Sequence, residues 1–293
     1  MPSFFRKYKE IMRYTNKELL FFGMVFITFT GNAFLFGPKS SECRPAYECN
    51  CNPLNYGAFD IALHAGVAPL VWIRHSALRV GTSVAPAPGP VLTLFNGPHF
   101  NNLFHMPLLV GAQVGYAWSD AVRFYAEGNY LHARGKKDNQ ITTLTTPALL
   151  ATLSLHAFRL FDAYVGARYY WPRWCDRISF FAGAKLGFTH HWQTHIDITV
   201  ATPQFLITNF LTDQLIFKHG ITISGGFNAG LDICFCGNWA LVVTAEVVAS
   251  GHPKINQELF LNPIIAGQFT SVSFGSIATE LRFPITAGVR YAF

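Results

Sequence analysis

Apolar and polar residues alternate with a period of two through most of the chain after Tyr56. Successive side chains of a β-strand point to opposite faces, so this alternation predicts strands with one apolar and one polar face. The clearest case is residues 277–293, where one face is almost wholly apolar from Ile277 to Phe293. The other face carries Glu280, Arg282 and Arg290 among small residues.

The alternation recurs in eight segments, which are 57–71, 104–118, 121–133, 149–171, 178–194, 219–235, 239–250 and 277–293. The connections between them alternate in length. Those at 118–121, 172–176 and 236–238 are short, whereas 72–103, 134–148, 195–218 and 251–275 are long and rich in Pro, Gly, Asn and Thr. An even number of strands with this alternation is typical of outer-membrane barrels.

We therefore predict an all-β fold, an antiparallel transmembrane β-barrel of about eight strands over residues 56–293. Ten strands is the alternative. Val91 to Phe95 and Ile196 to Phe217 contain β-branched and aromatic residues that could form an extra strand pair, or hairpins within the loops.

The two predicted faces differ sharply in charge. The apolar face has one charged residue, Arg159, which lies twelve residues before Trp171 and so near a membrane boundary. A cation near the bilayer midplane costs about 2–4 kcal/mol, so this face is expected to touch lipid. The other face is expected to line the lumen together with His64, and its charged residues are Asp60, Arg123, Glu127, Arg168, Lys185, Asp232, Glu246, Glu280, Arg282 and Arg290.

Two interpretations of the lumen charges remain open. Paired charges would form a salt-bridge network that fills a narrow barrel. Alternatively, the same residues would line a polar pathway for small solutes and set its charge selectivity.

Aromatic residues gather where the short turns are expected, which predicts a girdle at the headgroup level. They are Tyr116, Trp118, Tyr169, Trp171, Trp174, Trp239, Tyr291 and Phe293.

The first 33 residues have the layout of a secretory signal peptide. Five basic residues precede an apolar core at 19–29, and Gly31, Asn32 and Ala33 offer small residues for cleavage after Ala33. The alternative is a retained membrane anchor, since apolar character resumes at 34–36. We expect residues 34–55 to form a Cys-containing periplasmic segment.

Removal of the leader takes five of the 22 basic and two of the 16 acidic residues, which leaves a net charge of +3 instead of +6. The basic balance of the full chain therefore gives no support for a nucleic-acid partner. Only 13% of residues are charged and 15% are aromatic, a composition that suits apolar residues spread through alternating strands.

The last strand resembles the assembly signal of Gram-negative outer-membrane β-barrels. It ends on Phe293, with Tyr291 and Val289 at the alternating positions before it. The resemblance implies recognition by the barrel-assembly machinery, location in the bacterial outer membrane and contact with its lipids. Across the mature chain the pattern is similar to the small eight-stranded members of this superfamily.

All six cysteines fall on the predicted periplasmic side, where disulfides are permitted. The candidates for disulfides are Cys43, Cys49, Cys51, Cys175, Cys234 and Cys236. Their spacing does not match a zinc site, and no metal or cofactor is predicted. The chain loosely resembles the disulfide-cross-linked envelope proteins of chlamydia-like bacteria, and this implies disulfide-linked envelope proteins as partners.

These features favour a porin-like or structural envelope component stabilised by disulfides. The alternative is a surface adhesin or binding protein that uses the long loops. An outer-membrane lipid-modifying enzyme has less support, because no nucleophile motif is present. Ser250 with His252, or His190 with His191, would be the residues to test, and we predict no catalytic site.

Overall fold

The computed structural model describes residues 57–73, 79–84, 104–137, 139–142, 150–171, 177–202, 207–251, 254–255, 258–261, 268–273 and 279–293. The predicted signal peptide, the segment 34–55 and the stretch 91–95 lie outside these residues, so their interpretation stays a prediction. Across the described ranges, we find no helix of the length and hydropathy needed to cross a membrane.

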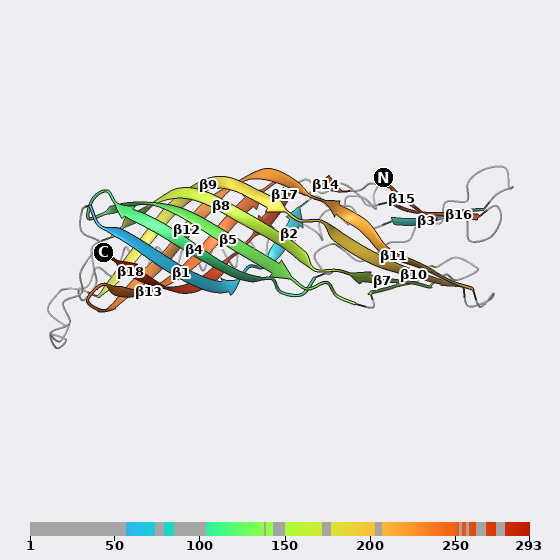
Figure 1. Ribbon diagram of the computed structural model, residues 1–293, viewed down its shortest axis with the longest axis horizontal. Helices are drawn as coiled ribbons and strands as arrows, with labels where there is room; N and C mark the ends of the chain where they lie inside the picture. The colour runs from blue at the N-terminus through green and yellow to red at the C-terminus, as the bar shows by residue number, and fades with distance from the viewer. Residues whose placement is uncertain are drawn as a thin grey trace, which may run out of the picture. The chain divides into compact units, whose positions relative to one another are not determined.

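Eight strands form a closed antiparallel ring (Figure 1). Each strand pairs with the next along the chain, and the last pairs with the first, with Leu63 opposite Val289. Closure leaves no unpaired sheet edge in the ring. The strands are β1 (Phe59–Val67), β4 (Leu108–Ala117), β5 (Val122–Ala133), β8 (Phe158–Tyr170), β9 (Ile178–His191), β12 (Gly220–Cys236), β13 (Trp239–Ser250) and β18 (Ile285–Ala292).

Two short strands prolong the ends of the ring. β2 (Leu70–Ile73) follows β1 after Pro69, and β17 (Thr279–Arg282) precedes β18 before Pro284. They pair with each other, and β17 also continues the pairing with β13. Proline cannot donate a ladder hydrogen bond, which explains why each strand is interrupted there and then resumes.

The short connections contain residues that favour tight turns. Ser119 Oγ accepts a hydrogen bond of 3.0 Å from the N–H of Val122, and Gly237 has a positive φ of 57°. A hydroxyl that bonds its own turn, and a glycine free of a Cβ, both stabilise sharp reversals. These turns keep strand neighbours in sequence adjacent in the ring.

The long connections also form β-structure. One five-stranded sheet has the order β14 (Lys254–Ile255), β11 (Ile207–Lys218), β10 (Thr194–Thr202), β7 (Leu150–Leu155) and β6 (Asn139–Thr142). A three-stranded sheet consists of β15 (Glu258–Leu261), β16 (Gln268–Ser273) and β3 (Arg79–Val84). The described loops are thus organised as sheets.

The structure confirms the predicted all-β, eight-stranded antiparallel barrel, and the ten-stranded alternative is wrong. The strand pair within 195–218 is a hairpin of the loop sheet and does not enter the ring. One strand boundary needs correction, since the predicted segment 149–171 is two strands. Leu155 and Phe158 are both buried, so the period of two breaks between them at His156 and Ala157, and β7 leaves the barrel.

Candidate functional site

The barrel has an apolar exterior. Among the described strands of the ring, every residue classed as exposed is apolar or Tyr, except Arg159. Leu63 is 66% exposed, Phe227 68% and Ile223 79%. Water would penalise such a surface, whereas hydrocarbon accepts it, and a closed barrel leaves no backbone group unpaired in lipid. The ring is a transmembrane barrel of the outer-membrane type.

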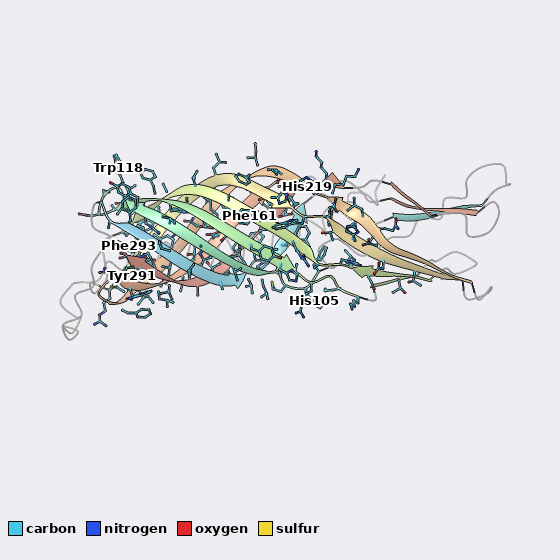
Figure 2. All side chains as sticks on the ribbon, in the orientation of Figure 1. His105, Trp118, Phe161, His219, Tyr291 and Phe293 are labelled. Carbon is cyan, nitrogen blue, oxygen red and sulfur yellow. The ribbon has the colours of Figure 1, made fainter. Side chains whose placement is uncertain are left out.

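Aromatic rings mark the end of the barrel that holds the short turns. Figure 2 places Trp118, Tyr291 and Phe293 together there, opposite His105 and His219. The ring of Tyr291 lies 4.8 Å from that of Trp239 and 5.1 Å from that of Phe293. Of the predicted assembly signal, Val289 and Phe293 are exposed and Tyr291 is partly covered. Their part in assembly remains a prediction.

The structure buries all ten of the charged residues assigned to the lumen, each at 7% exposure or less. It adds one that the sequence analysis missed, Asp162, which is 2% exposed. Asp162 lies six residues before Arg168, so the same period-two rule would have placed it on the inner face. His64 is partly buried beside them.

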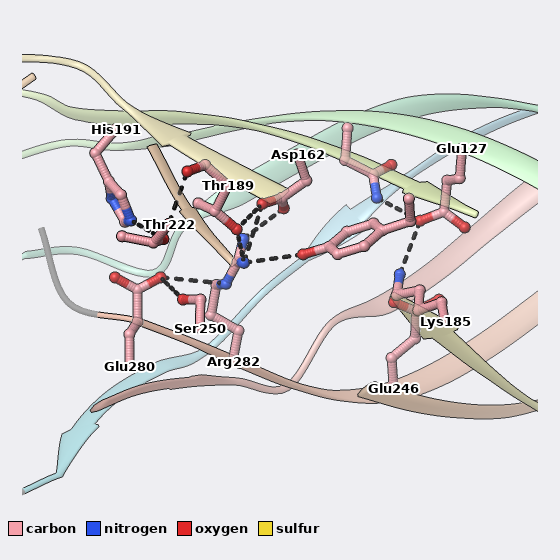
Figure 3. Close-up of polar contacts among 12 residues, drawn as sticks. Glu127, Asp162, Lys185, Thr189, His191, Thr222, Glu246, Ser250, Glu280 and Arg282 are labelled. Carbon is pink, nitrogen blue, oxygen red and sulfur yellow. Dashed lines mark hydrogen bonds and ion pairs between the residues drawn. The ribbon is translucent and has the colours of Figure 1, made fainter. Parts of the chain in front are cut away.

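One cluster centres on Arg282, on β17 (Figure 3). Its guanidinium lies 2.5 Å from a carboxylate oxygen of Asp162 and 3.2 Å from one of Glu280. It also donates hydrogen bonds to Thr189 Oγ1 at 2.9 Å and to the hydroxyl of Tyr164 at 3.1 Å. Strands on opposite sides of the ring are thereby tied together across the lumen.

A second cluster centres on Lys185, on β9 (Figure 3). Its ammonium lies 2.9 Å from Glu127 and 2.5 Å from Glu246, and 4.4 Å from the ring centre of Tyr164. Glu127 also accepts a hydrogen bond from Asn129. The aromatic ring of Tyr164 therefore connects the Arg282 and Lys185 clusters.

The remaining lumen charges form two ion pairs and one contact of a cation between two aromatic rings. Arg123 pairs with Asp60, and Arg290 pairs with Asp232. Arg168 has its guanidinium carbon 4.5 Å from the ring centres of both Tyr125 and Phe181. Such cation–π contacts strengthen where water is excluded.

These side chains fill the middle of the barrel. A cavity in the interior, bounded by His64, Gln113, Glu127 and Arg168, has a volume of about 10 Å³, room for at most about one water molecule. The arrangement therefore favours the filling network over an open solute pathway.

Apolar residues cover the loop end of the lumen. The ring of Phe158 lies 5.5 Å from that of Phe104 and 5.9 Å from that of Phe217, and both Phe158 and Phe217 are fully buried. Ile196 and Ile216, from the hairpin of β10 and β11, are fully buried as well. The hairpin is thus anchored to the barrel by an apolar core.

Two His–Asp pairs involve that hairpin, one of them with His156 from the link between β7 and β8. His156 Nε2 lies 3.0 Å from Asp197, and His195 Nδ1 lies 2.7 Å from Asp213. The backbone N–H of Asp213 donates to Asp197, and this bond, together with His156, lowers the pKa of the Asp197 carboxyl. Asp213 has a φ of 58°, at a register shift between the two strands. The bulge turns its carboxylate toward His195.

Of the two residue pairs considered for catalysis, the structure describes both members of one, His190 with His191. His191 is buried whereas His190 lies on the outer side, so the two side chains point to opposite faces. Ser250 donates to Glu280 at 3.4 Å within the lumen, and His252 lies outside the described residues. Within the part of the chain described, no group of three or more His, Cys, Asp or Glu residues is placed to hold a metal ion.

Of the six cysteines, only Cys234 and Cys236 lie on a described strand, at the turn end of β12. Cys234 is disulfide-bonded. Cys43, Cys49, Cys51 and Cys175 lie outside the described residues, so the disulfides expected of them stay a prediction.

No protein-family model and no curated protein matches the chain. Among solved structures, it is similar to Neisserial surface protein A, with 13% identity, a TM-score of 0.39 and coverage of 81% of this chain and 99% of that one. OprG from Pseudomonas aeruginosa has 10% identity, a TM-score of 0.37 and coverage of 83% and 99%. Ail, the attachment invasion locus protein of Yersinia pestis, has 10% identity, a TM-score of 0.30 and coverage of 80% and 99%. The fold assignment rests on the chain's own strand pairing.

Proposed function

We propose that the protein is a non-conducting structural barrel of a bacterial outer membrane that presents its loop sheets as a binding surface. The observation that carries this proposal is the filled lumen, in which every described charge has an opposite charge or an aromatic ring as its partner. The outer-membrane location follows from the closed ring and its apolar exterior.

The regular structure of the loop hairpin, β10 and β11, supports the binding role. Two residues separate β9 from β10, and one residue separates β11 from β12, so the hairpin directly prolongs two barrel strands. Its base is fixed by buried Ile196 and Ile216. A rigid platform loses little conformational freedom when it binds a partner, which favours affinity.

Conductance of the refolded full chain in a planar bilayer tests the filled lumen. We expect no channel events from the wild-type protein. Glu127, Lys185 and Glu246 meet at one level of the lumen, so E127A/K185A/E246A removes three large side chains at once and is expected to produce small channel events. Channel events from the wild-type protein would overturn the proposal and restore the porin-like function.

Replacement of the hairpin tests the binding role. Joining Trp192 to Gly220 through a short Gly-Ser linker removes β10 and β11 but keeps all eight barrel strands. We expect the shortened protein to refold and to lose adherence of cells that display it to immobilised host extracellular-matrix proteins. A shortened protein that supports the same adherence as the full chain would count against the hairpin as the binding surface.

The absence of catalysis is part of the proposal. Lipid hydrolysis by the refolded protein, followed with radiolabelled phospholipid, is expected to equal that of S250A. Turnover that disappears in S250A would favour an outer-membrane lipid hydrolase instead. Disulfide stabilisation would show as a change in mobility on non-reducing gels that involves Cys234.

A further inference from the structure

A group of basic side chains stands on the outer surface at the loop end of the barrel, just beyond the apolar band. It consists of Arg159, His190, Lys218, His219 and Lys254, and we call it the basic rim. Arg159 begins β8 and His190 ends β9, while Lys218 and His219 join β11 to β12 and Lys254 is on β14. Figure 2 shows His219 at this end, opposite Trp118.

Strand pairing brings these side chains close together. Lys218 and Lys254 are directly opposed partners in the pairing of β11 with β14. The stem of Lys254 passes beside Gly220, with its Cδ 4.0 Å from the point where a Cβ would stand on that residue. His219 Nδ1 lies 3.0 Å from His190 Nε2. His190, Lys218, His219 and Lys254 therefore form one contiguous patch, and Arg159 lies next to it, where its backbone carbonyl accepts the N–H of Trp192.

No ion pair between described side chains neutralises the charge of the rim. Within the described residues, the exposed acids of this end, Asp197 and Asp213, pair with His156 and His195, and no ion pair involves Arg159, Lys218 or Lys254. Like charges directly opposite each other on paired strands are destabilising. A bound anion would offset the repulsion between two lysines held in that position.

The position of the rim along the barrel axis indicates the source of such an anion. Outward-facing positions of β8 run from Tyr169 at the turn end to Arg159, ten residues away. At about 2.4 Å of height per residue of a tilted strand, they span about 24 Å, close to the apolar band of about 25 Å in such barrels. Trp192, whose ring lies 5.1 Å from that of His190 and 5.7 Å from that of Tyr130, marks the same boundary. The basic rim therefore lies at the level of the lipid headgroups.

From this placement we propose that the basic rim is a binding site for the phosphate groups of a phosphorylated lipid in the leaflet at the loop end. Lysine ammonium groups act as point charges on phosphate, and the Arg159 guanidinium can hold two phosphate oxygens at once. The acyl chains of the same lipid would lie against the apolar band below. This site does not use the sealed lumen, and it shares Lys218 with the base of the hairpin, so the point variants K218Q/K254Q and R159Q test it with the hairpin in place.

Titration of the full refolded chain in neutral detergent micelles tests the site. The probes are bisphosphorylated lipid A and the same lipid with its phosphates removed, with bound lipid counted by native mass spectrometry. Each cation near a membrane surface contributes about fivefold in affinity, so K218Q/K254Q is expected to bind the phosphorylated lipid about 25-fold more weakly. R159Q is expected to lose about fivefold.

The matched control is R177Q, because Arg177 is a cation at the opposite, turn end of the barrel. It is expected to bind the phosphorylated lipid as the wild type does. Equal binding of the two lipids, or unchanged binding by K218Q/K254Q, would overturn the proposal. All variants are compared only after their circular dichroism shows the wild-type β-sheet signal, so that loss of the fold is not read as loss of the site.

Soluble anions provide the last arm of the experiment. Inorganic phosphate and a sulfated polysaccharide are each added as competitors of the phosphorylated lipid. We expect inorganic phosphate to compete only at far higher concentration than the lipid, since it lacks acyl chains. If the polysaccharide binds through Lys218 and Lys254 while the lipid does not, the rim serves a soluble polyanion and the lipid proposal is wrong.

Discussion

The lipid face and the lumen face of this barrel are built by the same strands, the eight of the ring together with β17, yet the two faces differ in the charges that they hold. The outer face holds one charged residue, Arg159, among its exposed strand positions. The inner face buries eleven charged residues, of which ten make ion pairs and Arg168 lies between two rings. The odd or even position of a residue on its strand decides whether its side chain faces lipid or the lumen.

The two environments differ in whether they can stabilise a charged side chain. Hydrocarbon cannot stabilise a charge, so the outer face excludes charges. The lumen also buries its charges, but a charge there faces other strands, and an opposite charge can be placed across from it. Substitutions that move a charge between these settings should therefore have large and predictable costs.

Removal of the central lumen cation should have the largest effect. Arg282→Met would leave Asp162 and Glu280 buried without their partner, which typically costs about 3–5 kcal/mol of unfolding free energy. Urea unfolding in phospholipid bilayers, followed by tryptophan fluorescence, measures the cost. Arg177→Met, at the turn rim, is the matched control and should change stability little. A loss for Arg282→Met no larger than that of the control would show that the network is not needed.

A new charge on the lipid face should cost somewhat less. Leu186 is 62% exposed and pairs with Val165 near the middle of the band. Leu186→Arg is expected to lower the unfolding free energy by about 2–4 kcal/mol, because the guanidinium must enter hydrocarbon or distort the bilayer. The same urea titration measures it, with Leu186→Met as the control for altered packing. Unchanged stability would mean that water reaches this face.

Among the described residues, Arg168 is the one lumen cation without an ion pair to a carboxylate, and its removal should cost less again. Arg168→Met keeps a long side chain between Tyr125 and Phe181, so only the cation–π contacts are lost, about 1–2 kcal/mol. A double-mutant comparison with Arg282→Met should show additive losses, since the two sites share no ion pair. A loss as large as that of Arg282→Met would indicate that Arg168 balances acidic groups at longer range.

The sequence was enough to predict the ring, because lipid outside and charge inside force a strict period of two on every strand. It was not enough to predict which charges pair. Arg282 and Asp162 are 120 residues apart, and only the closed ring brings them together. The loop strands were harder still. The apolar–polar alternation of β7 continues into β8 except for a shift of one position at His156. This one-residue shift is the only sequence signal that β7 belongs to the loop sheet and not to the barrel.

Arg159 is the exception on the lipid face, and its replacement should have the smallest effect. Its backbone carbonyl accepts the N–H of Trp192 at 3.2 Å, at the boundary of the apolar band, where a lipid-facing cation costs about 0–1 kcal/mol. Arg159→Leu should therefore shift the unfolding free energy by less than about 1 kcal/mol. Leu186 lies about three outward-facing positions deeper in the apolar band, so Leu186→Arg should shift the unfolding free energy several times more. Both variants are measured in one bilayer, so the ratio of the two effects reports depth alone. A large gain in stability for Arg159→Leu would place Arg159 in hydrocarbon, and the band would then extend further toward the loop sheets than the strand geometry implies.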